Sequence, residues 1–210
     1  RKEVTTFSVP FNVEEVKKTT NTSINNARKT SKEKIISQAL KFHLQGNISE
    51  ASHYYKYCLD QDFNDPRVYS NYGIILKDLG NLQEAELSTR KAIELNPDFA
   101  DAHSNLGIIL RDLGKSQEAE LSTRKAIRLN PDFADAHANL GNLLRDLGKL
   151  KEAELSLRKA IEFNPDYSDA HYNLGAILRD LGNLQEAELS LRKAIELNPD
   201  FADAHSNLGN

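Results

Sequence analysis

Histidine is the side chain of this chain best suited to bind a metal or to move a proton near neutral pH. Four histidines follow one another at intervals of 34 residues: His103, His137, His171 and His205. A zinc ion needs its nitrogen ligands about 2 Å away, whereas two helices in each interval would separate the rings by packing distances of about 8–10 Å. Tyr69 also stands where a fifth histidine would fall. We therefore predict a packing role for these rings and no metal site.

Amide and charged side chains recur at the same interval. The asparagine ladder consists of Asn71, Asn105, Asn139, Asn173 and Asn207. One aspartate series is Asp101, Asp135, Asp169 and Asp203; a second is Asp78, Asp112, Asp146 and Asp180, with Lys77, Arg111, Arg145 and Arg179 beside it. A primary amide both donates and accepts hydrogen bonds, so a row of asparagines suits the backbone of an extended peptide. There is no phosphate-binding glycine loop and no nucleophile elbow. These patterns predict a binding protein without catalytic residues or a cofactor.

Glycine and proline show how the chain positions these side chains. All ten glycines fall into two series with the 34-residue period. The series are Gly46, Gly80, Gly114, Gly148 and Gly182, and Gly73, Gly107, Gly141, Gly175 and Gly209. Pro97, Pro131, Pro165 and Pro199 keep the same period. A fixed period of this length is typical of a stacked repeat architecture.

Each period contains two amphipathic helices. In one unit, apolar residues recur at helical spacing from Ala100 to Leu113, and Gly114 follows where a left-handed residue ends a helix. A second helix is predicted from about Gln117 to Leu129, before Pro131 stops it. Its apolar set is Ala119, Leu121, Ala126, Ile127 and Leu129. Asn47, Asn81 and Asn183 each precede a glutamate by three residues, which predicts side-chain caps.

Glycine in the middle of the first helix, as at Gly107, costs about 1 kcal/mol relative to alanine. Such a cost in every unit predicts a close approach of the second helix, with residues such as Ala119 facing the glycine. Each unit is then a tightly nested helical hairpin, and stacking of neighbouring units buries the remaining apolar faces.

The residues Asn105-Leu106-Gly107, Gly114, Glu118-Ala119, Ala126 and Pro131 resemble the tetratricopeptide motif. The resemblance covers residues 32–210 and implies an all-α, right-handed superhelix of antiparallel helix pairs. The units are 32–65, 66–99, 100–133, 134–167 and 168–201, followed by a partial unit at 202–210. The first departs from the pattern, with Ala39 in place of a glycine and Phe63 in place of the proline. Units two to five are similar to the repeat arm of O-linked N-acetylglucosamine transferase and to bacterial tetratricopeptide proteins.

The resemblance implies that the asparagine ladder lies on the concave side and holds the backbone of a peptide. The second aspartate series and the arginines beside it, Arg111, Arg145 and Arg179, would complete this binding surface. Two alternatives remain open: the asparagines bond to the adjacent repeat and set the stacking angle, and the charged residues form a solvated face. Glu–Arg pairs four residues apart on the second helices, such as Glu120 and Arg124, are assigned to solubility.

Composition limits the class of partner. The net charge is −4; residues 1–31 carry +3, which leaves −7 for residues 32–210. An acidic body argues against nucleic acid as the partner. No apolar run approaches the roughly 20 residues of a membrane-spanning helix. A single cysteine, Cys58, excludes an internal disulfide and favours the cytoplasm; its counterparts in later units are alanines, which favours a packing role.

Residues 1–31 are predicted to be a flexible arm with one apolar stretch, 7–13. At the other end the chain stops inside a first helix, so Leu189, Leu191 and Ile195 are expected to lack a neighbour and to favour association with another copy. The leading prediction is a non-catalytic scaffold that binds an extended peptide or a partner protein. The alternatives are a substrate-recruiting arm of a larger transferase, with its catalytic domain beyond Asn210, and a self-stacking oligomer.

Overall fold

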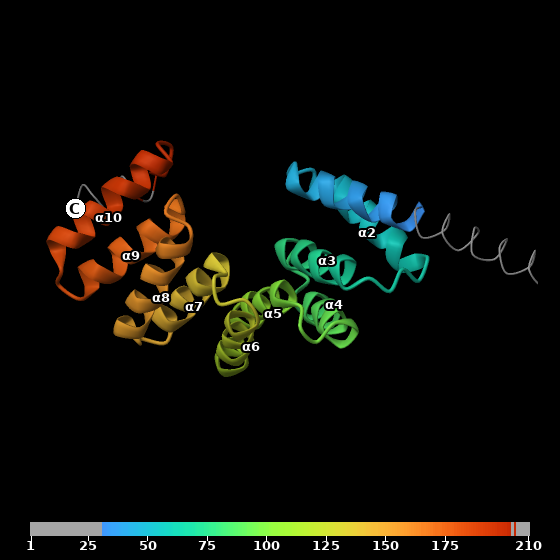
Figure 1. Cartoon of the computed structure of the whole chain (residues 1–210), viewed down its shortest axis with the longest axis horizontal. Helices are drawn as coiled ribbons and strands as arrows, with labels where there is room; N and C mark the ends of the chain where they lie inside the picture. The colour runs from blue at the N-terminus through green and yellow to red at the C-terminus, as the bar shows by residue number, and fades with distance from the viewer. Residues whose placement is uncertain (1–30, 203, 205–210) are drawn as a thin grey trace, which may run out of the picture. The chain divides into compact units, whose positions relative to one another are not determined.

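The structure of the protein, a computed structural model, describes residues 31–202 and 204. Every regular element in this part of the chain is a helix, as predicted (Figure 1). The chain divides into two compact units, residues 1–63 and residues 64–210. The predicted flexible arm, apart from its last residue, lies outside the described residues.

The first unit contains a helix over residues 31–44 and α2 (Ile48–Asp60). The Asn47 side chain accepts a hydrogen bond from the Glu50 backbone N–H at 3.3 Å, which confirms the predicted cap at this helix. Tyr55 and Cys58 are fully buried, and the rings of Phe42 and Tyr54 lie 5.4 Å apart. Cys58 is thus a packing residue, as predicted.

The second unit is a series of helical hairpins, which can be followed in Figure 1 from green to red. They are α3 (Pro66–Asp78) with α4 (Leu82–Leu95), α5 (Ala100–Asp112) with α6 (Ser116–Leu129), α7 (Ala134–Asp146) with α8 (Leu150–Phe163), and α9 (Ser168–Asp180) with α10 (Leu184–Leu197). The predicted helices of the third unit are therefore confirmed to within one residue.

The turn inside each hairpin depends on the conformation of its glycine. Gly114 has a φ of 75°, and no heavy atom lies within 4 Å of where its Cβ would be. The glycine is therefore required by the left-handed backbone and not by space. The caps predicted at Asn81 and Asn183 are wrong: both residues precede a helix, but neither side chain bonds to a backbone N–H there.

The glycine inside each first helix is required by lack of space for a side chain and not by its backbone conformation. A Cβ on Gly141 would lie 2.6 Å from Cγ of Leu157, and one on Gly107 would overlap Thr123 Oγ1. The predicted close approach is confirmed, with one correction. Ala119 contributes only its carbonyl oxygen, 3.4 Å from the Gly107 Cβ position, and the side chain one turn later fills the contact.

Neighbouring hairpins of the second unit pack through both of their helices. The more extensive contact is that of α4 on α5, α6 on α7 and α8 on α9, and the first helices also pack in series, α3 on α5, α5 on α7 and α7 on α9. Leu106 and Leu110 of α5, Ala119 of α6 and Leu143 of α7 form one buried cluster that spans two repeats. The first helices therefore form a continuous row that carries most of the asparagine ladder.

Candidate functional site

The described members of the asparagine ladder lie half-buried on the first helices, and two of them bond to the preceding repeat. Nδ2 of Asn105 donates to Ser70 Oγ at 3.0 Å, and Nδ2 of Asn139 donates to Ser104 Oγ at 3.1 Å. Both serines are buried. The amides therefore link successive repeats, which is the stacking role that the sequence left open.

The other described members have different partners. Nδ2 of Asn71 donates to the carbonyl oxygen of Arg67 in its own helix, at 2.9 Å. Asn173 has Ala138 where the serine would be, and its Oδ1 accepts a bond from Arg145 Nη1 at 3.2 Å. Asn207 lies outside the described residues. No described residue bonds to Oδ1 of Asn105 or Asn139, so these amides retain an acceptor and one N–H donor.

The charged residues predicted beside the ladder form loose pairs. Arg111 approaches Asp112 at 3.4 Å and, across the repeat boundary, Asp146 at 4.0 Å. Arg179 lies 3.9 Å from Asp180, and Arg145 lies 4.0 Å from Asp146. These side chains are about one-third to one-half exposed, so the pairs contribute little to stability. They remain accessible to a charged ligand.

Asn142 is a residue of this face that the sequence analysis did not single out. It stands on α7 where α3 and α5 have Ile74 and Ile108. Its Oδ1 is buried and has no hydrogen-bond partner among the described residues. An unsatisfied buried acceptor costs about 1–3 kcal/mol. The signal for it in the sequence was an asparagine at a position that holds isoleucine in the two preceding repeats.

The recurring histidines bind the loop before their own helix. Nε2 of His103 lies 2.9 Å from the carbonyl oxygen of Pro97, and His137 and His171 make the same bond at 2.9 Å to Pro131 and Pro165. Their role is thus a hydrogen bond to the loop as well as the predicted packing. Within residues 31–202 and 204, no three histidine, cysteine, aspartate or glutamate side chains are grouped to hold a metal ion.

Charged side chains on the second helices do more than the predicted solubility role. Arg124 pairs within its helix with Glu120 at 2.9 Å and across the repeat boundary with Glu152 at 3.3 Å. Lys149 of the next repeat reaches back to Glu120 at 3.0 Å. The pair Arg90–Glu118, at 2.8 Å, and the pair Lys115–Glu86, at 2.7 Å, join the preceding repeats in the same way. These bonds therefore hold neighbouring hairpins together.

The same bonds shift the acidity of the two bridging glutamates. The pKa of Glu86 is lowered, chiefly because its carboxylate accepts a hydrogen bond from Lys115, with Arg90 adding to the effect. The pKa of Glu120 is lowered in the same way by Lys149 and then Arg124. Both side chains are mostly buried, with 13% and 19% exposure. The ionised forms are thus part of the folded structure.

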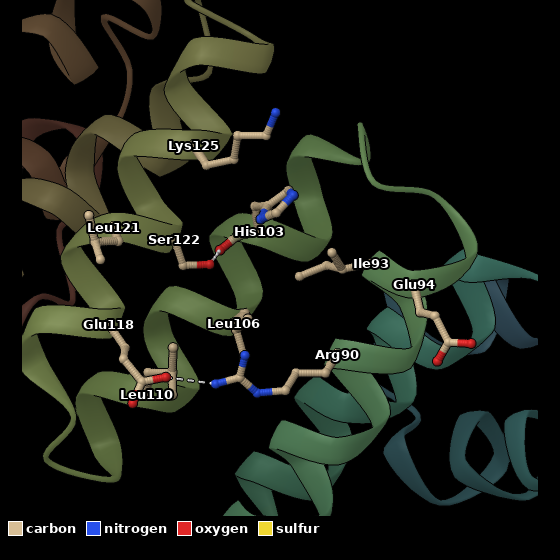
Figure 2. A pocket seen from close by; sticks show the side chains of 10 residues that line it. All are labelled: Arg90, Ile93, Glu94, His103, Leu106, Leu110, Glu118, Leu121, Ser122 and Lys125. Carbon is tan, nitrogen blue, oxygen red and sulfur yellow. Dashed lines mark hydrogen bonds and ion pairs between the residues drawn. The ribbon is translucent and has the colours of Figure 1, made fainter.

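Two grooves open between consecutive second helices. The α4–α6 groove has a volume of about 520 Å³ and Leu106 and Leu110 of α5 in its lining. Figure 2 shows Arg90 extending from α4 toward Glu118 on α6 at this groove. The α6–α8 groove, of about 330 Å³, lies one repeat further on. Every residue that lines it has a counterpart 34 positions earlier in the α4–α6 groove, and one pair differs in type: Glu94 and Arg128.

Leu121 belongs to this outer surface. The sequence assigned it to the apolar face of its helix, but its side chain is 69% exposed, so that prediction is wrong. Its counterparts are exposed to the same degree: Leu87, Leu155 and Leu189. The buried positions are instead Thr123 and Leu157, which meet the glycines of the first helices. An exposed leucine at the same place in four repeats is therefore a regular feature of the second helices.

Comparison with known families decides what this architecture is. The model of the TPR repeat matches residues 73–114 and 141–178, and two models of the tetratricopeptide repeat match residues 100–133 and 168–201, and residues 123–154. Together these stretches run without a gap from residue 73 to residue 201, which is more than half of the chain. The chain belongs to the tetratricopeptide-repeat family.

Solved structures of other tetratricopeptide-repeat (TPR) proteins have the same fold. MamA is 27% identical, over 79% of this chain and 96% of that chain, with a TM-score of 0.62. YrrB, described as a TPR protein with an unusual peptide-binding site, is 25% identical over 84% of this chain and 91% of that chain, with a TM-score of 0.61. TTC0263, a thermophilic TPR protein of Thermus thermophilus, has a TM-score of 0.72 at 21% identity, over 85% and 97% of the two chains. No curated protein sequence matches the chain.

The exposure of Leu189 near the last described residues does not indicate that this end of the TPR array lacks a neighbour. Leu189 is 66% exposed, but so is Leu155 inside the array. Leu191 is buried at 3% exposure, against Gly175. The exposed leucines thus give no support for a sticky end in particular. None of the described helices has the length and apolar character needed to cross a membrane.

Proposed function

We propose that this TPR array is a non-catalytic scaffold that binds an extended peptide or a partner protein along the asparagine ladder. The observation that supports this most is the state of Asn105 and Asn139. Each amide is fixed in orientation by a bond to a buried serine of the preceding repeat, yet keeps an acceptor and a donor for a ligand. Pre-oriented groups lose little conformational entropy when a ligand binds.

The surroundings of the ladder fit a peptide backbone better than one particular side chain. The residues beside it repeat with little variation, and the paired charges Arg111–Asp112 and Arg145–Asp146 offer both signs. A groove of this kind provides regular backbone contacts and modest selectivity. The presence of a peptide-binding site in YrrB, a protein of the same fold, adds to this proposal. We further propose a cytoplasmic location, since a chain with a single cysteine forms no internal disulfide.

The test separates ligand binding from stacking. Binders are selected from a phage-displayed library of random extended peptides, and their affinity is measured for the full chain and its variants. Changing Asn105, Asn139 and Asn173 together to alanine is expected to abolish binding of the selected peptides, while circular dichroism shows the same helix content.

The matched control removes the same two hydrogen bonds between repeats by changing the serine acceptors instead of the asparagine donors. Ser70→Ala with Ser104→Ala takes away both acceptors but leaves the asparagines, and the next repeat already has Ala138 at this position. This control is expected to weaken peptide binding by about fivefold and not to abolish it, because the asparagines remain and only their fixed orientation is lost, a cost on the order of 1 kcal/mol. If both sets of variants lose affinity and stability together, the ladder serves stacking alone and the proposal fails.

A further inference from the structure

The two outer grooves differ at one lining position, and that difference reverses a charge. In three of the four full repeats of the second unit the position holds a glutamate: Glu94, Glu162 and Glu196. In the remaining repeat it holds Arg128, which lines the α6–α8 groove. The α4–α6 groove has Glu94 in this place and thereby serves as an internal reference.

The substitution leaves a local excess of positive charge in an acidic protein. Lys91, Lys159 and Lys193 each pair with the glutamate three residues later at 2.7 Å. The equivalent lysine, Lys125, has Arg128 three residues later in place of a glutamate, and its carboxylate contact is Asp98 at 3.8 Å. No carboxylate of residues 31–202 pairs with Arg128. Arg124 and Lys159 line the same groove, but both already have carboxylate partners: Glu120 and Glu152 for Arg124, and Glu162 for Lys159. Arg128 is thus the lining charge that distinguishes the α6–α8 groove.

The same groove offers apolar contacts. Among its lining residues, Leu140 is buried at 4% exposure, Ile127 is half-buried, and Leu155 is 66% exposed. The volume of about 330 Å³ is at the lower end of the range for ligand pockets. It suits one or two apolar side chains of a peptide rather than a whole protein surface.

We infer that the α6–α8 groove is a second binding site, for a segment of a partner protein in which leucine-like side chains stand next to carboxylates. The apolar side chains would contact Leu155, Ile127 and Leu140, and a carboxylate would pair with Arg128. This site lies on the second helices, whereas the asparagine ladder lies on the first helices, so it is independent of the peptide-binding role proposed above.

The probe is a fluorescein-labelled peptide with two leucines flanked by aspartates, titrated into the full chain and followed by fluorescence anisotropy. Two matched peptides have serines in place of the leucines or lysines in place of the aspartates. We expect the acidic leucine peptide to bind and each matched peptide to bind at least about fivefold more weakly. Binding is also expected to weaken as salt is raised from about 50 to about 500 mM, because exposed charge pairs are screened.

Arg128→Glu gives the groove the residue that the other three repeats have, so the fold is expected to tolerate it. We expect about five- to tenfold weaker binding, since an attraction becomes a repulsion at an exposed site. Leu155→Asn removes the exposed apolar contact and is expected to weaken binding as well. Glu94→Arg in the α4–α6 groove should do the reverse, and raise the stoichiometry from one to two peptides per chain.

Circular dichroism of each variant checks that the helix content is unchanged. The inference is overturned if the acidic leucine peptide does not bind, if Arg128→Glu leaves its affinity unchanged, or if the serine peptide binds equally well. The chain itself has apolar residues beside Glu14 and Glu15, so a second copy is a rival occupant. If light scattering shows self-association that Arg128→Glu abolishes, the site joins copies of this chain and the inference of a separate partner is wrong. The asparagine variants described above are expected to bind this probe normally.

Discussion

The α4–α6 groove and the α6–α8 groove share the same ion pairs between repeats but differ in the charge of one lining residue. In both, an arginine of one second helix pairs with a glutamate of the next, and a lysine reaches back to a bridging glutamate. The two linings differ in charge at one position, where the first groove has Glu94 and the second has Arg128. The comparison shows that a repeat array can keep its stacking contacts and change its binding chemistry at one surface position.

The largest effect is expected at the buried contact behind each groove, where the two repeats differ. Leu157→Ala should lower the free energy of unfolding by about 2–5 kcal/mol, because the side chain is fully buried against Gly141 and its loss leaves a cavity. Thr123→Ala, at the equivalent position, should cost about 1 kcal/mol, since it loses a small side chain and its bond to the Ala119 carbonyl oxygen at 2.9 Å. Urea denaturation followed by circular dichroism measures both. Equal losses would show that the two hairpins pack alike.

A gain of stability is expected on the opposite face of α7. Asn142→Ile restores the residue that α5 has as Ile108 and removes a buried acceptor without a described partner. The free energy of unfolding should rise by about 1–3 kcal/mol. Thermal melting against the wild type checks this, with Ile108→Asn as the reverse change in α5. A loss of stability from Asn142→Ile would mean that the amide has a partner in solution, such as an ordered water molecule.

The bridging glutamates should matter equally to both grooves. Glu86→Gln and Glu120→Gln are each expected to cost about 1 kcal/mol, because each breaks two charged bonds at a mostly buried carboxylate. Glu188 provides the control: its side chain is 51% exposed, and its pair is with Arg192 in the same helix. Glu188→Gln should therefore change stability by only a few tenths of a kcal/mol. If all three variants behave alike, the bonds between repeats do not stabilise the stack.

The same two glutamates predict how stability depends on pH. The pKa of Glu86 and that of Glu120 are lowered in the folded protein, so the folded state favours the ionised form more than the unfolded state does. This contribution is complete above the ordinary pKa of about 4.3 and is lost as the pH falls through the lowered folded values. Melting temperatures measured from about pH 6 down to about pH 3 should fall less in the Glu86→Gln, Glu120→Gln double variant than in the wild type. Parallel curves for the two proteins would contradict the role of these bonds.

The smallest effect on stability is expected at the exposed leucines. Leu121→Asn and Leu155→Asn should each leave the free energy of unfolding within about 0.5 kcal/mol of the wild type, because these side chains are 69% and 66% exposed. Differential scanning calorimetry is sensitive enough for this comparison. A loss above about 1 kcal/mol in either variant would show that the leucine contributes to packing, and would remove it as a candidate binding contact.

Much of the fold followed from local rules. The 34-residue period, the two helices per unit, the left-handed glycine at Gly114 and the close contact at Gly107 were all predicted from residue types and spacing. The capping at Asn81 and the burial of Leu121 were predicted by the same rules and are wrong. Both depend on small differences in the orientation of a side chain at the edge of a helical face, which spacing alone does not resolve.

The candidate sites needed the stacked structure. The asparagine ladder was visible in the sequence as a series, but its bonds to Ser70 and Ser104 were not, nor were the pairs that join Glu86 to Lys115 and Glu120 to Lys149. The outer grooves were missed altogether, although the change from glutamate to arginine at position 128 is visible when the repeats are aligned with one another.

The sequence by itself determined the helices, their pairing into hairpins and the period of the array, because helix periodicity, proline and left-handed glycine act within the 34 residues of one repeat. Only the tertiary structure decided that Leu157 is buried while Leu155 is exposed, that Asn139 bonds to the repeat before it, and that Arg128 lines a groove with Leu155. These features depend on the distance and the angle between one hairpin and the next. That geometry results from the sum of weak contacts along the whole interface, and no single repeat encodes it.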